Sequence, residues 1–154
     1  VMLSVVSQLL SKRYMTTIRE EEGGSYGVGV SPSSSKLPTP EFSLNISFDC
    51  NPEKRDRLVE IVKEKIVKIQ NEACDAVDLN EIKNNFIKSR EEAELQNSFW
   101  MSSIQKNLML GSELTSKEDY IKMIENIDAD SIQNFAKEIL KNVNTVEVIM
   151  NPKK

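Results

Sequence analysis

Hydrophobic positions recur at helical spacing through the first 19 residues of the chain. The apolar residues that share this spacing are Leu3, Val6, Leu9, Leu10, Met15 and Ile18. They form one apolar stripe against a face of Ser, Lys and Thr, which predicts an amphipathic helix from Met2 to Arg19. Gly23 and Gly24 follow and should end the helix, because glycine accepts the left-handed dihedrals common at helix C-termini.

The next two segments alternate apolar and polar residues with the period of two that is typical of β-strands. The first strand is predicted over Tyr26–Val30 and the second over Phe42–Phe48. Residues 31–40 read SPSSSKLPTP, a composition that favours an irregular and mobile loop over any regular element. The three segments together predict an antiparallel hairpin with a long loop.

The remaining pattern predicts four helices and a final strand. Asn51 caps a helix with Pro52 at its first position, whose buried face should run from Leu58 to Ala73. The motif at 78–81 (DLNE) resembles a capping box and starts a longer helix that ends near Gly111. Residues 115–118 should open a short helix in the same way, Asp128 should cap another, and residues 146–150 should form a strand. Three strands are few for a stable sheet, so further strands are expected outside residues 1–154.

Composition excludes several classes of chemistry. The 154 residues contain no histidine, which rules out a His-x-x-Glu-His zinc site, a Ser-His-Asp triad and a Cys-His dyad within this chain. The net charge of -4 comes from acidic and basic residues that alternate along the helices, which argues against nucleic acid as a partner. No apolar run approaches the roughly 20 residues that would span a bilayer.

The two cysteines flank a predicted helix and should lie far apart. At about 1.5 Å per residue, that helix places Cys50 and Cys74 on the order of 30 Å from each other. A disulfide requires Cα atoms within about 7 Å. We therefore expect two free thiols that share neither a bond nor a metal.

Arg19 and Tyr26 are the candidate functional residues. An arginine carries a permanent charge with fixed donors, and a tyrosine hydroxyl is a strong donor, so both suit a carbonyl oxygen that gains negative charge. The glycine turn could bring them together. The structural alternative is that Arg19 neutralises the helix C-terminus while Tyr26 packs in the sheet. The carboxylates at 20–22 fit a solvated turn better than a general base or metal ligand, since no histidine accompanies them.

The motif Arg-Glu-x-x-Gly-Gly-x-Tyr at residues 19–26 resembles the zinc-free half of the insulinase-like (pitrilysin-type) zinc metallopeptidases, most of all the bacterial predicted zinc proteases. Weaker similarity covers the rest of the chain, including DLNEIKN at 78–84, the turn at 111–114 and the closing segments 128–140 and 146–150. The resemblance implies an α+β fold, a two-layer sandwich with helices on one face of an antiparallel sheet. Residues 1–154 would be the C-terminal part of one such domain, truncated on its N-terminal side.

The same resemblance implies the chemistry. The complete enzyme would be a zinc-dependent endopeptidase in which Arg19 and Tyr26 bind the scissile carbonyl of a peptide or protein substrate. The zinc would belong to a partner domain of the same protein, and this chain would bind none and be inactive alone. Relatives of this type favour a periplasmic over a cytoplasmic location. The alternative is a catalytically inactive scaffold or assembly subunit of the same fold.

Overall fold

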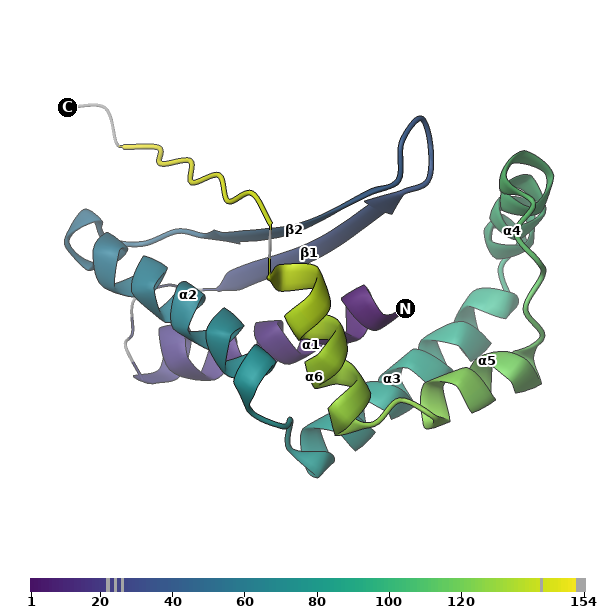
Figure 1. The fold of residues 1–154 in the computed structure, drawn as a ribbon, viewed down its shortest axis with the longest axis horizontal. Coiled ribbons are helices and arrows are strands. Elements are labelled where there is room, and N and C mark those ends of the chain that lie inside the picture. The colour runs from purple at the N-terminus through teal and green to yellow at the C-terminus, as the bar shows by residue number, and fades with distance from the viewer. Residues whose placement is uncertain (22, 24, 26, 142, 152–154) are drawn as a thin grey trace.

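A β-hairpin lies over a layer of helices in the computed structural model of this protein, which describes residues 1–21, 23, 25, 27–141 and 143–151 (Figure 1). The elements in chain order are α1 (Met2–Tyr14), a π-helical segment (Met15–Glu21), β1 (Val28–Ser35), β2 (Glu41–Phe48), a 3-10 turn (Pro52–Lys54), α2 (Arg55–Asn71), α3 (Ala76–Glu94), α4 (Asn97–Leu110), α5 (Lys117–Glu125) and α6 (Ala129–Leu140). This arrangement confirms the α+β, two-layer prediction with helices on one face of an antiparallel sheet.

Helix α1 forms the centre of the core. It lies beneath β1 and contacts α2, α3 and α6, and Leu9, Leu10 and Tyr14 on it are at most 1% exposed. The side chains that close around it include Leu58, Ile61, Ile82, Ile132 and Ala136. Full burial of one aliphatic side chain contributes about 1.5–3 kcal/mol, so this cluster holds the hairpin and helices together. The amphipathic helix predicted from the N-terminal stripe is confirmed, although its last turns widen into the π-helical segment.

The hairpin is longer than the sequence pattern indicates. Its antiparallel register runs from Val28 opposite Phe48 to Ser35 opposite Glu41, so residues 31–35 are strand and the prediction of an irregular segment there is wrong. Pro32 pairs with Leu44. A proline is tolerated in a strand when its nitrogen faces away from the partner, and β1 has no second partner among the described residues.

Two helix predictions also need correction. The helix expected to start at Asp78 begins at Ala76, because the side chain of Asp75 accepts a hydrogen bond from the Val77 amide and caps the helix earlier. The single long helix expected up to Gly111 is two helices, α3 and α4, separated at Leu95 and Gln96. Ala73, expected on the buried face of α2, lies beyond the end of that helix and is exposed.

The predicted C-terminal strand does not form in this chain. Residues 143–151 adopt neither helix nor strand, and Val146 and Val148 are 83% and 82% exposed. A strand is defined by hydrogen bonds to a neighbour, and no described segment pairs with this one. The residues have strand-forming character, but the described part of the chain offers them no partner.

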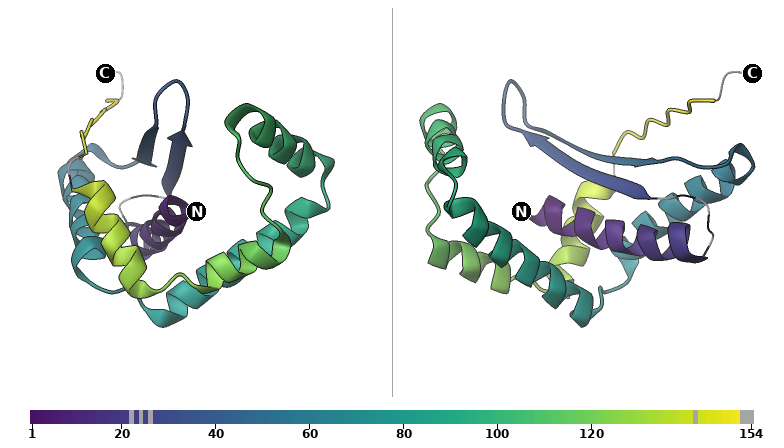
Figure 2. Two further views of the ribbon diagram at one scale, coloured as in Figure 1. Left: turned by 45° about the vertical axis from the view of Figure 1, so that its right-hand side comes forward. Right: turned by 180° about the vertical axis from the view of Figure 1, so that it is seen from behind.

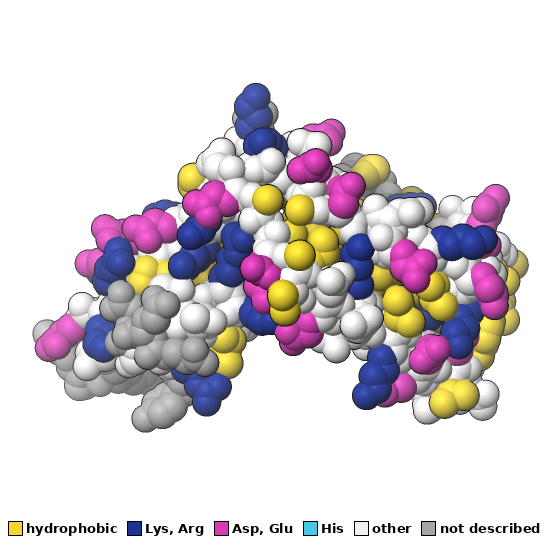
Figure 3. Space-filling model, turned by 90° about the horizontal axis from the view of Figure 1, so that it is seen from below, with side chains coloured by type: hydrophobic (Ala, Val, Ile, Leu, Met, Phe, Trp, Pro, Cys, Tyr) yellow, Lys and Arg dark blue, Asp and Glu magenta, His cyan; other side chains and the backbone are white. Residues whose placement is uncertain are grey.

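Helices α3, α4 and α5 form an arm that extends away from the body made by α1, α2, α6 and the hairpin (Figure 2). Lys12 on α1 ties the base of the arm to the body through an ion pair with Asp78 on α3 at 2.8 Å, and it also pairs with Glu81. Figure 3 views the helical side and shows charges of both signs mixed over it, with apolar side chains visible toward the end that carries the arm.

Candidate functional site

The π-helical segment places Arg19 at the surface. Thr17 and Ile18 in this segment are 9% and 0% exposed, whereas the side chain of Arg19 is exposed. π-Helical turns are rare and often occur at functional sites. The sequence folds this way because Ile18 continues the apolar stripe of α1 into the core, which turns the next side chain outward.

The turn after Arg19 leads directly into the hairpin. Gly23 has a φ of +54°, in the left-handed region, which supports the expectation that glycine redirects the chain here. The hydroxyl of Ser25 donates to the carbonyl of Gly27 at 2.8 Å and accepts from the Gly27 amide at 3.2 Å. Strand β1 then starts at Val28 and contacts the π-helical segment that carries Arg19.

Tyr26 lies outside the described residues, as do Glu22 and the side chains of Glu20 and Glu21. The proximity of Arg19 and Tyr26 is therefore still a prediction, and the structural alternative for this pair stays open.

The described residues offer no cluster of donor groups for a zinc ion. The sequence has no histidine, and the described residues contain no group of three His, Cys, Asp or Glu side chains that could hold a metal ion. Both cysteines are free, as expected, and Cys74 is buried. Burial raises the pKa of the Cys74 thiol and so disfavours the thiolate that a metal requires.

Arg90 lies at the centre of a cluster of charged and aromatic side chains that the sequence analysis did not identify. The Nε atom of Arg90 donates to Glu94 at 2.6 Å, and its Nη2 atom donates to the Thr115 carbonyl at 2.8 Å. The guanidinium lies 4.4 Å from the ring centre of Phe99 and 5.0 Å from that of Tyr120. One side chain thus joins α3, α4 and α5, and no sequence signal marks it out from the neighbouring charges.

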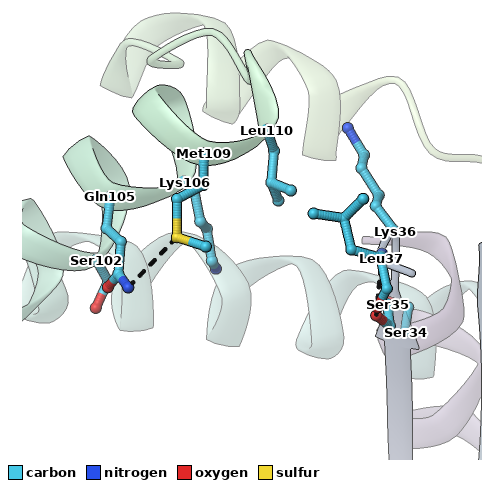
Figure 4. A pocket seen from close by; sticks show the side chains of 9 residues that line it. All are labelled: Ser34, Ser35, Lys36, Leu37, Ser102, Gln105, Lys106, Met109 and Leu110. Carbon is cyan, nitrogen blue, oxygen red and sulfur yellow. Dashed lines mark hydrogen bonds between the residues drawn. The ribbon is translucent and has the colours of Figure 1, made fainter. Parts of the chain in front are cut away.

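A cleft of about 400 Å³ separates the tip of the hairpin from α4 (Figure 4). Its walls are residues 34–37 on the hairpin and Ser102, Gln105, Lys106, Met109 and Leu110 on α4, and we call it the α4 cleft. It lies at the end of β1 opposite to Val28, where the strand starts after the π-helical segment. No local sequence motif marks this cleft, because its two walls are far apart in the sequence.

The described residues thus form an α+β arrangement with an exposed Arg19, and comparison with known proteins identifies the family. Residues 1–86 match the family model described as the peptidase M16 inactive domain. This chain belongs to the peptidase M16 family, which confirms the resemblance to insulinase-like zinc metallopeptidases. No helix in the described residues is long and apolar enough to cross a membrane.

Two curated relatives are zinc proteases by name. The probable zinc protease PqqL of Escherichia coli is 23% identical over 152 residues, which cover 98% of this chain and 16% of the relative. The zinc protease PQQL-like of Arabidopsis thaliana is 24% identical over 107 residues, covering 66% of this chain and 11% of the relative. The chain therefore spans less than a fifth of the length of these relatives.

Solved structures share the fold. The crystal structure of the periplasmic protease PqqL from Escherichia coli superimposes with a TM-score of 0.74 at 20% identity, over 89% of this chain and 15% of that one. A peptidase M16 inactive domain from Pseudomonas fluorescens superimposes with a TM-score of 0.73 at 15% identity, over 93% of this chain and 34% of that one.

Proposed function

We propose that this chain is the substrate-binding, zinc-free portion of a zinc-dependent endopeptidase. The observation that carries the proposal is the exposed Arg19 at the end of a π-helical segment, seven residues before Tyr26, in a chain of the M16 family. The names of the curated relatives support peptide hydrolysis by the whole protein.

In this proposal Tyr26 donates a hydrogen bond to the oxygen of the scissile carbonyl, and Arg19 adds a fixed positive charge. Both groups gain most when that oxygen becomes negative in the tetrahedral transition state. A well-placed donor of this kind contributes about 3–4 kcal/mol to catalysis. Zinc, which in such enzymes activates the attacking water, would be held outside residues 1–154, since the described residues offer no cluster of donor groups for it.

Residues 1–154 are, in the same proposal, the C-terminal part of one domain whose sheet is completed by other parts of the polypeptide. The described sheet has only two strands, and the strand-like residues 143–151 have no partner in it. Unpaired strand edges are normally covered or paired in native proteins. A periplasmic location is proposed from the relative whose structure carries that description.

The test is Tyr26→Phe in the full-length enzyme, assayed on a cleavable peptide. Because the hydroxyl recognises a charge that exists only in the transition state, kcat should fall roughly 10²- to 10³-fold with little change in KM. Arg19→Lys should also lower kcat, since it keeps the charge but loses the planar fork. Tyr120→Phe makes the same chemical change on α5 in the arm and should leave kcat unchanged.

Two outcomes would count against the proposal. If Tyr26→Phe keeps near-normal kcat while thermal stability falls, then Tyr26 is a packing residue. If the full-length protein contains no zinc motif and cleaves no peptide, then the chain belongs to a catalytically inactive scaffold of the same fold.

A further inference from the structure

Strand β1 has one hydrogen-bonding edge without a partner. Its other edge pairs with β2 over all eight residues, and no further strand lies beside it in the described part of the chain. Backbone groups alternate in direction along a strand, so every second residue of β1 turns its N–H and C=O toward the open edge. Such an edge is a template on which another extended chain can pair.

Pro32 identifies which residues of β1 face the open edge. It has no N–H, and it lies opposite Leu44 within a continuous antiparallel register, so its nitrogen points away from β2. Val28 and Val30 precede it by four and two residues and therefore turn the same way. They present two donors and two acceptors, and Pro32 adds one acceptor. No backbone hydrogen bond from another described element reaches these groups.

The same proline indicates that β1 stays at the edge of the sheet in the complete protein. A strand that paired along all of β1 would find no donor at Pro32, and proline is confined to edge strands and bulges. The strand-like residues 143–151 lie on the far side of β2 from β1 (Figure 1), where Glu147 is 3.7 Å from Lys63 on α2. The strands that complete the sheet therefore belong beside β2, which leaves the first half of β1 open.

The open half of β1 begins next to the candidate catalytic pair. Val28 follows Tyr26 by two residues, which is at most about 7 Å along an extended chain. Strand β1 also contacts the π-helical segment that carries Arg19. A peptide paired with Val28 and Val30 would thus continue toward the place where the proposed chemistry occurs.

We propose that residues 28–32 of β1 bind an extended segment of the peptide substrate by adding it to the sheet as a further strand. This rests on the proposed function, because it assigns the way in which the same site holds its substrate. Main-chain hydrogen bonds supply the affinity in this mode, so the substrate class is an extended peptide with free amide groups. Gly29 and Ser31 alternate with the pairing residues and leave room for large side chains on the bound peptide.

Val30→Pro in the full-length enzyme tests the pairing on the protein side. It removes the outward N–H of residue 30 without removing a bond to β2, because Pro32 already occupies an equivalent position. For a peptide that the enzyme cleaves, KM should rise about 3- to 10-fold with kcat unchanged, since the lost bond forms equally in the ground and transition states. Val30→Ala controls for the lost side chain, and Ser34→Pro places the same ring at an outward position beyond Pro32. Both controls should leave KM unchanged.

Methylation of the peptide tests the same bonds from the substrate side. An N-methyl group removes one amide donor at a time, so pairing with Val28 and Val30 should raise KM at alternate positions of the peptide. At one of these positions, Val30→Pro should abolish most of the effect of methylation, whereas Ser34→Pro should preserve it. This coupling assigns the lost bond to β1 rather than to another part of the enzyme.

Three results would overturn the inference. The first is equal KM for Val30→Pro and Ser34→Pro with both proteins folded by circular dichroism, and the second is a methylation pattern that Val30→Pro does not change. The third is unfolding of Val30→Pro while Val30→Ala and Ser34→Pro stay folded, which would mean that a strand of the protein itself uses this edge. Any of these results together with the expected loss of kcat in Tyr26→Phe would reject the strand pairing and leave the proposed function intact.

Discussion

Replacing Arg90 by alanine should release α4 from the arm while leaving the body of the fold intact. Arg90 contacts α3, α4 and α5 at once, and its side chain is only 15% exposed. Its removal leaves Glu94, 18% exposed, without this partner and opens the space between the rings of Phe99 and Tyr120. The effect should therefore be local to the arm.

The expected cost follows from these contacts. Each hydrogen bond to a charged group contributes about 1.5–3 kcal/mol, and each cation–π contact about 0.5–1 kcal/mol. The contacts are not additive, and water replaces part of the two hydrogen bonds, so a net loss of about 2–4 kcal/mol is reasonable. This corresponds to a roughly 30- to 1,000-fold larger open population, at tenfold per 1.4 kcal/mol.

Hydrogen exchange of the full-length protein measures this loss directly. Amides of residues 97–110 should exchange faster by that factor in Arg90→Ala, while those of α1 should not change. Lys88→Ala is the control, because Lys88 pairs with Glu92 at 3.9 Å on an exposed face of the same helix. If α4 exchanges at the same rate in both variants, Arg90 does not hold the arm.

Three further predictions concern stability and metal content. Tyr14→Phe should lower the free energy of unfolding by about 1 kcal/mol in urea titrations, because the Tyr14 hydroxyl donates to the Val62 carbonyl at 3.1 Å in the core. Burial raises the pKa of the Tyr14 hydroxyl. The contribution of Tyr14 to the free energy of unfolding should therefore be complete below about pH 10 and decline as the pH rises further, and Tyr14→Phe should weaken this loss of stability at alkaline pH. Gly111→Ala should cost about 1 kcal/mol of thermal stability from backbone strain alone, because φ is +61° and no atom lies within 4 Å of the added methyl group. Residues 1–154 prepared alone should hold no stoichiometric zinc after dialysis, and one tightly bound zinc per chain in metal analysis would contradict the proposed division of labour.

Local sequence signals predicted most helix ends and the second strand. Asp128 caps α6 as expected, Ser116 within the predicted start at 115–118 caps α5, and Gly111 ends α4 in the left-handed conformation. These features depend on hydrogen bonds between neighbouring residues, which a short sequence window contains. The alternating pattern of Phe42–Phe48 was equally informative, because Leu44, Ile46 and Phe48 do pack against the core.

Features that depend on distant partners were not predictable in this way. Residues 31–35 look like loop, yet they form strand because β2 lies opposite them. Residues 146–150 look like strand, yet they remain unpaired because the described chain supplies no neighbour. The role of Arg90 depends on three helices meeting in space, and the α4 cleft depends on the hairpin tip reaching α4, so neither has a local signature.

The candidate site was identified by its motif, and only part of it has been located. Arg19 is exposed at the end of the π-helical segment, as a substrate-facing group requires. Tyr26 lies outside the described residues, so its role depends on functional tests.

The most direct of these tests is the affinity of the full-length enzyme for a peptide whose scissile amide is replaced by a tetrahedral phosphinate. If Tyr26 stabilises the oxyanion, Tyr26→Phe should weaken binding of this analogue roughly 10²- to 10³-fold, matching its loss of kcat, and leave affinity for the unmodified peptide unchanged. Equal weakening of both ligands, or of neither, would contradict a role for Tyr26 in transition-state stabilisation.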